Sequence, residues 1–265
     1  MPSLPFALLD RWRSPAPDPR KVRWIGEHDY AHRGLYDGGV PENSLAAFAR
    51  AAMSGFGIEL DIQRSSDGRA IVFHDETLDR MTAERGPVVK YTSVQLGGFT
   101  LAGTAQTIPT LRDVLAEIDG RVPVLIEVKS SQDARVSATC LAVRRVLEGY
   151  TGKHAVMSFD PRVSRWFAQY SPHTVRGLSF TERDDRALPG KIRRQLALWH
   201  ARPDFLAYDI RDLPSRFAAR QRRRGLPIVS WTLYSAEHLS RAAEHADADI
   251  LETGAAALKG AVRQA

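Results

Sequence analysis

Residues 205–233 read FLAYDIRDLPSRFAARQRRRGLPIVSWTL and contain two apolar segments separated by a highly charged one. The segments 205–210 and 227–233 are rich in Leu, Ile, Val and aromatic residues, which is typical of buried strands, and 214–223 is typical of a helix. A strand, a helix and a strand in this order form a unit whose two strands lie parallel. The stretch therefore predicts a parallel sheet covered by helices.

The same alternation extends along most of the chain. Strand-like segments occur at 122–128, 154–159, 174–180 and 248–252, and helix-like segments at 134–147, 161–170, 190–199, 236–245 and 255–262. Counted from the strand before His32, there are nine strand-like segments, and one of them is the return arm of a hairpin. The remaining eight predict an α/β fold, a closed (β/α)8 TIM barrel, which 265 residues are sufficient to form.

Two regions do not follow the alternation. Residues 1–27 are expected to form an N-terminal arm before one barrel domain at 28–265, and three prolines between Arg13 and Arg20 predict an irregular stretch within it. Residues 76–107 contain several glycines and predict a short inserted loop region after the hairpin that ends at His74. The sequence leaves open whether apolar residues of this insertion line an exposed channel or pack on the barrel: Val88, Val89, Tyr91, Leu96, Phe99 and Leu101.

Two acids, Glu59 and Asp61, interrupt an apolar strand that reads GIELDI at 57–62. Residues at i and i+2 of a strand share one face, so the two carboxylates point the same way. One interpretation is a site for a hard divalent cation, Mg²⁺ or Ca²⁺, because a buried carboxylate needs compensation and these cations prefer oxygen ligands. The other is a solvated strand face, or salt bridges to arginine. The pair by itself leaves both open.

A turn after this strand determines where His74 is expected to lie. Asp67-Gly68 lies between two strand-like segments, which is typical of a hairpin. Antiparallel pairing of the return arm brings His74 opposite Glu59 and Asp61. A lone histidine beside acids is often structural, but beside a metal site it is a candidate acid or base.

The order of several short motifs resembles the glycerophosphodiester phosphodiesterase family over residues 28–255. The elements that carry the resemblance are His32-Arg33-Gly34, Glu42-Asn43-Ser44, Glu59-Leu60-Asp61, His74-Asp75 followed by Leu78-Asp79-Arg80, Ile108-Pro109-Thr110-Leu111, Leu125-Ile126-Glu127-Val128-Lys129 and Val229-Ser230-Trp231-Thr232. Each is short, but their order and spacing together are specific.

The resemblance implies roles for individual residues. Glu59, Asp61 and Glu127 are the implied ligands of a divalent metal, Mg²⁺ or Ca²⁺. His32 and His74 are the implied acid and base, and three residues are implied to contact the phosphate or the substrate: Arg33, Lys129 and Trp231. Other interpretations exist for some of them, since Glu127 and Lys129 can form an ion pair along one strand, His32 and Arg33 can end a strand, and Trp231 can pack inside the barrel.

The implied activity is metal-dependent hydrolysis of glycerophosphodiesters to sn-glycerol 3-phosphate and an alcohol, the work of a phosphoric diester hydrolase in lipid and glycerol metabolism. Two alternatives remain, a phosphodiesterase of the lysophospholipase D type and a non-catalytic ligand-binding barrel. The sequence does not distinguish the two histidines as acid and base. It also leaves open the alcohol, the oligomeric state, and whether water or the glycerol 2-hydroxyl attacks first.

Composition adds a few expectations. No segment has the length and apolar character of a membrane span, and the first ten residues lack the basic start of a secretory signal, so a cytoplasmic protein is expected. The single Cys140 predicts no internal disulfide. A small-molecule substrate is the expected partner, with no nucleic acid.

The net charge of +6 and the basic cluster at Arg216, Arg220, Arg222, Arg223 and Arg224 leave a weak contact with an anionic surface possible. The simpler interpretation is that these arginines end a helix before Gly225. Near the last strand, Glu252 stands one position away from the acid expected from the resemblance, and its role is open.

Overall fold

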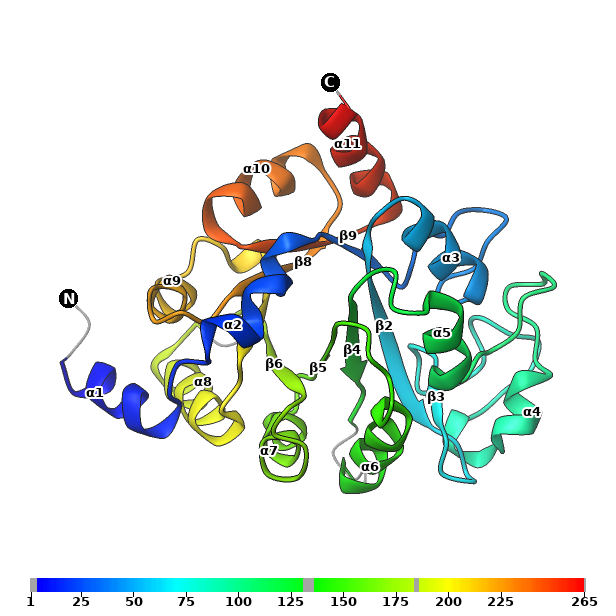
Figure 1. The fold of residues 1–265 in the computed structure, drawn as a ribbon, viewed down its shortest axis with the longest axis horizontal. Helices are drawn as coiled ribbons and strands as arrows, with labels where there is room; N and C mark the ends of the chain where they lie inside the picture. Colours follow the sequence, from blue (N-terminus) through cyan, green and yellow to red (C-terminus); the bar gives the residue numbers. More distant parts are fainter. Residues whose placement is uncertain (1–3, 131–135, 184–185, 265) are drawn as a thin grey trace.

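The computed structural model describes residues 4–130, 136–183 and 186–264, and in it eight parallel strands close into a barrel (Figure 1). The strand order is β1-β9-β8-β7-β6-β5-β4-β2, and β1 also pairs with β2, which closes the ring. The predicted (β/α)8 barrel is confirmed. Its strands are β1 Tyr30–His32, β2 Gly57–Arg64, β4 Val124–Val128, β5 His154–Met157, β6 Val175–Phe180, β7 Phe205–Asp209, β8 Ile228–Leu233 and β9 Ala248–Leu251.

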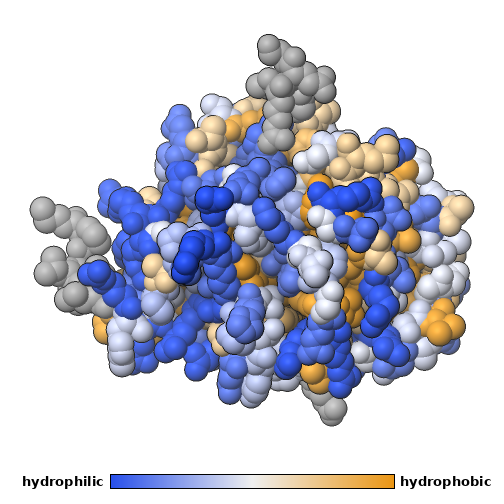
Figure 2. Space-filling model, in the orientation of Figure 1, coloured by the Kyte–Doolittle hydropathy of each residue, from blue (hydrophilic) through white to orange (hydrophobic). Residues whose placement is uncertain are grey.

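Helices surround this barrel, and the face seen in Figure 2 is mainly hydrophilic because their apolar sides pack inward. Local sequence starts them: Ser44 caps α3, Thr110 forms a capping box at α5, and Asp160 caps α7 ahead of a first-turn proline. Among the described residues, none of the helices is both long and apolar enough to cross a bilayer. The helices around the barrel are α3 Leu45–Met53, α5 Leu111–Ile118, α6 Val136–Leu147, α7 Pro161–Tyr170, α8 Leu188–Ala201, η3 Ile210–Asp212, α9 Arg216–Arg223, α10 Ala236–His245 and α11 Thr253–Gln264.

The predicted hairpin is present as β3, Ala70–Val72, which pairs antiparallel with the end of β2. Its turn needs a glycine, because Gly68 has a φ of +79°, in the left-handed region that other residues rarely adopt. Immediately after β3, the Phe73 N–H donates to the Asp61 carbonyl at 3.0 Å. This hydrogen bond holds the backbone next to His74 against the acidic strand.

The insertion after the hairpin has a core of its own. It contains η2 Val88–Lys90 and α4 Ser93–Gly97. The buried side chains of this core include Val88, Leu96 and Leu101, with Tyr91 and Phe99 packed against them, whereas Val89 is about half exposed. Of the two interpretations left open for these apolar residues, packing describes all but Val89.

The N-terminal region contains the irregular stretch expected between Arg13 and Arg20, in shortened form and flanked by helices. It forms α1 Leu4–Arg13, α2 Pro19–Val22 and η1 Arg23–Glu27, and only residues 14–18 between them are irregular. Asp18 caps α2, and Val22 and Ile25 pack into the apolar cluster inside the barrel. The sequence did not reveal α1, since its attachment depends on buried Asp10, which accepts hydrogen bonds from the side chains of distant residues: Gln195, Trp199 and Gln221.

The basic cluster on α9 is largely occupied by contacts within the protein. Arg220 and Arg224 lie 3.4 and 3.6 Å from Asp10, and Arg222 lies 2.9 Å from Asp247. The helix ends before Gly225, whose φ is +92°. The simpler interpretation of this cluster, as a helix end, is confirmed for Arg220, Arg222, Arg223 and Arg224, whereas Arg216 begins the helix.

Candidate active site

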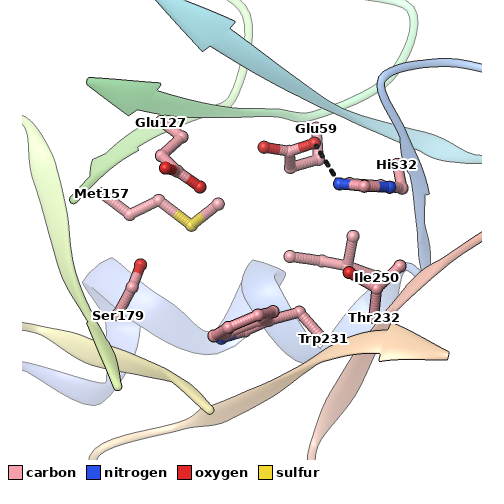
Figure 3. Close-up of a pocket in the computed structure, with 8 residues that line it drawn as sticks. All are labelled: His32, Glu59, Glu127, Met157, Ser179, Trp231, Thr232 and Ile250. Carbon is pink, nitrogen blue, oxygen red and sulfur yellow. Dashed lines mark ion pairs between the residues drawn. The ribbon is translucent and has the colours of Figure 1, made fainter. Parts of the chain in front are cut away.

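The register of the barrel brings the charged residues of β1, β2 and β4 together at the carboxyl ends of the strands. His32 pairs with Glu59 across β1 and β2, and Asp61 pairs with Glu127 across β2 and β4. These strand ends are where active sites of this fold lie. Figure 3 shows the pocket at this position, lined by His32, Glu59, Glu127, Met157, Ser179, Trp231, Thr232 and Ile250.

Three carboxylates form a potential metal site. Glu59, Asp61 and Glu127 each offer an oxygen, and these oxygens lie within 4.8 Å of one another. Glu59 and Asp61 are each only 1% exposed. Burial, together with the charge of Asp61, raises the pKa of Glu59 to about 8. A buried acid that resists ionisation beside two further carboxylates fits a hard divalent cation, which would supply the missing positive charge.

Lys129 follows Glu127 on the same strand face and joins two of these carboxylates. Its Nζ lies 2.8 Å from Asp61 Oδ1 and 2.6 Å from Glu127 Oε1. Burial alone would lower the pKa of Lys129 and raise that of Asp61, but their mutual attraction reverses both directions. The ion pair that the sequence left as an alternative is thus present, and it places a cation beside the acidic triad.

Arg33 lies beside the same carboxylates. Its backbone N–H donates to Glu59 Oε2 at 3.2 Å, and its guanidinium Nε is 3.3 Å from Asp61 Oδ2. This arrangement depends on Gly34, where an added Cβ would lie 2.8 Å from the Ala47 backbone and where φ is +85°. The His-Arg-Gly motif therefore places the imidazole of His32 and the guanidinium of Arg33 directly before a tight turn that requires glycine.

His32 is held by an acid from the last strand end. Its Nδ1 is 2.6 Å from Glu252 Oε1, and Tyr36 donates its hydroxyl to the other oxygen of Glu252 at 2.6 Å. Because a carboxylate only accepts, Nδ1 carries the proton and Nε2 faces Glu59 at 4.0 Å. Burial lowers the pKa of His32, but Glu252 and Glu59 outweigh it, so the pKa is raised.

His74 is held by a corresponding acid. Its Nδ1 is 2.7 Å from Asp75 Oδ1, and Asp75 is in turn 2.6 Å from Arg80. Arg80 and Arg33 both contact Glu42, at 2.6 and 2.8 Å. A continuous chain of charged contacts thus connects the two sequence motifs around His74 and Arg33.

Several of these supporting residues had no assigned role in the sequence analysis. Glu42, Asp75 and Arg80 lie within the quoted motifs, and that position was the only available signal. Asn43, whose Nδ2 donates to Asp61 Oδ2 at 2.9 Å, was also missed. Their function depends on contacts between loops that sequence spacing does not show.

Trp231 comes from β8, on the side of the pocket away from Glu59 and Glu127 (Figure 3). Its ring packs edge-on against Phe159, with centroids 5.3 Å apart. It lines the pocket and also contributes to the apolar cluster inside the barrel. Both interpretations of this tryptophan, substrate wall and packing, therefore describe part of its position.

Comparison with known proteins connects this geometry to a family. Residues 32–253 match the model of the glycerophosphoryl diester phosphodiesterase family. A glycerophosphodiester phosphodiesterase of Caldanaerobacter subterraneus is 35% identical over 161 residues, covering 57% of this chain and 65% of the relative. One from Bacillus altitudinis is 41% identical over 107 residues, covering 38% and 43%. The chain thus spans about half the length of these curated relatives.

Solved structures show the same fold. A phosphodiesterase of Oleispira antarctica, solved in complex with the product sn-glycerol-3-phosphate, superimposes with a TM-score of 0.77 at 21% identity. The match covers 89% of this chain and 96% of that one. A glycerophosphodiester phosphodiesterase of Thermotoga maritima gives a TM-score of 0.70 at 23% identity, covering 88% and 97%. These likenesses show that the barrel is shared.

Proposed function

The chain belongs to the glycerophosphoryl diester phosphodiesterase family, and from this membership we propose that it hydrolyses glycerophosphodiesters to sn-glycerol 3-phosphate and an alcohol. The observation that carries the proposal is the acidic triad, with His32 Nε2 4.0 Å from Glu59, together with a carboxylate at Nδ1 of both His32 and His74. Hydrolysis of an anionic diester needs charge neutralisation, a proton acceptor and a proton donor. The carboxyl end of this barrel provides a group for each requirement.

We propose that Glu59, Asp61 and Glu127 hold Mg²⁺ or Ca²⁺, which when bound neutralises phosphate charge and acts as a Lewis acid. Lys129 and Arg33 lie beside the same carboxylates and bind phosphate oxygens. Trp231 forms part of the wall that receives the organic part of the substrate.

His32 and His74 move the protons. One ring accepts a proton from the attacking water or glycerol 2-hydroxyl, and the other donates one to the departing alkoxide. In each, a carboxylate at Nδ1 fixes the ring and leaves Nε2 for the reaction. Glu252 is therefore a positioning residue for His32, which gives its departure from the expected motif a physical role.

The substrate class is tested by assaying release of glycerol 3-phosphate from glycerophosphocholine and glycerophosphoethanolamine, in parallel with lysophosphatidylcholine. We expect turnover of the first two, because the apolar residues of the insertion are largely packed into a core. Turnover of lysophosphatidylcholine with none of glycerophosphocholine would overturn the proposal. Failure of all three substrates with either metal would favour a non-catalytic barrel.

Replacing Glu252 with glutamine is expected to lower kcat about 10- to 100-fold with little change in KM, as for other residues that orient a catalytic group. The amide keeps an acceptor for Nδ1 but loses the charge that stabilises the protonated ring. Tyr36→Phe serves as the control, since it removes only the second contact of Glu252 and should have a smaller effect. An unchanged kcat in the Glu252→Gln variant would contradict the role of this acid.

A further inference from the structure

The two sides of the pocket differ in chemistry. Glu59 and Glu127 lie along one side in Figure 3, and Ser179 and Trp231 lie along the other. The other uncharged side chains that line the pocket are Met157, Thr232 and Ile250, so none of the side chains opposite the two glutamates carries a charge. If the charged side takes the cation and the phosphate, as proposed above, the uncharged side is left for an organic group.

Two polar atoms on the uncharged side have no hydrogen-bond partner among the residues that the structure describes. They are Ser179 Oγ and Trp231 Nε1, and both are withdrawn from the protein surface. Ser179 is only 4% exposed. A buried donor without a partner costs free energy, so exceptions of this kind need an explanation.

Two neighbouring hydroxyls at the same strand ends do have partners within the protein. Ser158, just after β5, donates to the Val128 carbonyl at 2.7 Å. Thr181, just after β6, donates to Asp209 Oδ2 at 3.1 Å. Other buried polar atoms also lack a partner among the described residues, such as Ser230 Oγ on β8 and Thr253 Oγ1 just after β9, but only Ser179 and Trp231 of this group line the pocket.

The chemistry of the two atoms defines the group they fit. An indole N–H can only donate, so its partner must be an acceptor, whereas a serine hydroxyl both donates and accepts. A hydroxyl oxygen satisfies both, but a quaternary ammonium offers no acceptor and no donor. The edge-on contact of Phe159 holds the Trp231 ring at the pocket, which favours a defined direction for its N–H.

We propose that Ser179 and Trp231 form a subsite for the hydroxyl groups of the leaving alcohol, so that the enzyme prefers diesters whose leaving group is a polyol. This inference rests on the proposed function. The inference predicts a higher kcat/KM for glycerophosphoglycerol than for glycerophosphocholine.

The test compares kcat/KM for these two diesters in the wild type, Ser179→Ala and Trp231→Phe. Each variant removes one donor, and each should reduce the ratio of kcat/KM for glycerophosphoglycerol to that for glycerophosphocholine about tenfold, the effect of one hydrogen bond. Ser164→Ala is the matched control. The Ser164 hydroxyl, on α7, is also buried, but it donates to the carbonyl of Gly177 on β6, the strand that carries Ser179. The variant should therefore keep the wild-type ratio.

Binding of both diesters is also measured by isothermal titration calorimetry in chelator, where the cation is removed. Tighter binding of glycerophosphoglycerol that Ser179→Ala abolishes, together with no turnover of either diester in Mg²⁺ or Ca²⁺, would support the subsite and overturn the proposed activity. Turnover of both diesters with an unchanged ratio in both variants would overturn the subsite and leave the activity standing. Equal losses for the two diesters would also overturn it, because the donors would then contact the glycerol that both share.

Discussion

Replacing Glu59 with glutamine is expected to reduce turnover of glycerophosphocholine at least about 10³-fold, because it removes one charged carboxylate of the proposed metal site. The substituted amide keeps the size of the side chain but binds a hard cation weakly. Steady-state kinetics over a range of metal concentrations measure the loss. Glu76→Gln is the control, since it removes an exposed carboxylate from the loop after His74.

The same variant should have the opposite effect on stability when metal is absent. Burial and Asp61 raise the folded-state pKa of Glu59 to about 8, above its ordinary value. A group with a raised pKa contributes stability at low pH and loses it as pH rises through that pKa. In chelator, Glu59→Gln should therefore melt at a higher temperature than the wild type above about pH 8, with a smaller difference near pH 5. A lower melting temperature of the variant at both pH values would contradict the prediction that the ionised Glu59 carboxylate destabilises the metal-free protein.

The second large effect is expected at the two histidines. Replacing either His32 or His74 with alanine should lower kcat about 10²- to 10⁴-fold, the usual contribution of a positioned acid or base. His173→Ala is the control because this histidine is exposed and lies outside the site. Near wild-type turnover in either active-site variant would remove that histidine from the mechanism.

An activated leaving group distinguishes the two roles. In the p-nitrophenyl diester of glycerol 3-phosphate, the departing p-nitrophenolate oxygen needs little protonation. The variant that lacks the acid should then recover most of its rate, and the variant that lacks the base should not. Equal recovery of both would contradict a division of labour between the rings.

The barrel could be predicted because its strands and helices alternate locally along the chain. Gly68 and the apolar pattern of β2 were also sufficient to predict the hairpin and the approach of His74 to the acidic strand. The third carboxylate is placed by the strand register, because Asp61 pairs with Glu127 where β2 and β4 are neighbours. The triad was therefore accessible from sequence as soon as the fold and the resemblance were recognised.

Other parts depend on contacts between distant residues. Glu252 lies 220 positions after His32, and only closure of the barrel brings them within 2.6 Å. The attachment of α1 depends on Asp10 and on partners 185 and 211 positions later in the chain. That Ser179 Oγ and Trp231 Nε1 lack hydrogen-bond partners can be recognised only from the positions of all nearby polar atoms. Local spacing contains none of this information.

The most direct test of the central claim is release of glycerol 3-phosphate from glycerophosphocholine by the wild type in Mg²⁺ or Ca²⁺, with and without chelator. The account predicts turnover that chelator abolishes and that added metal restores. Turnover of the same rate in chelator would contradict a metal site at Glu59, Asp61 and Glu127.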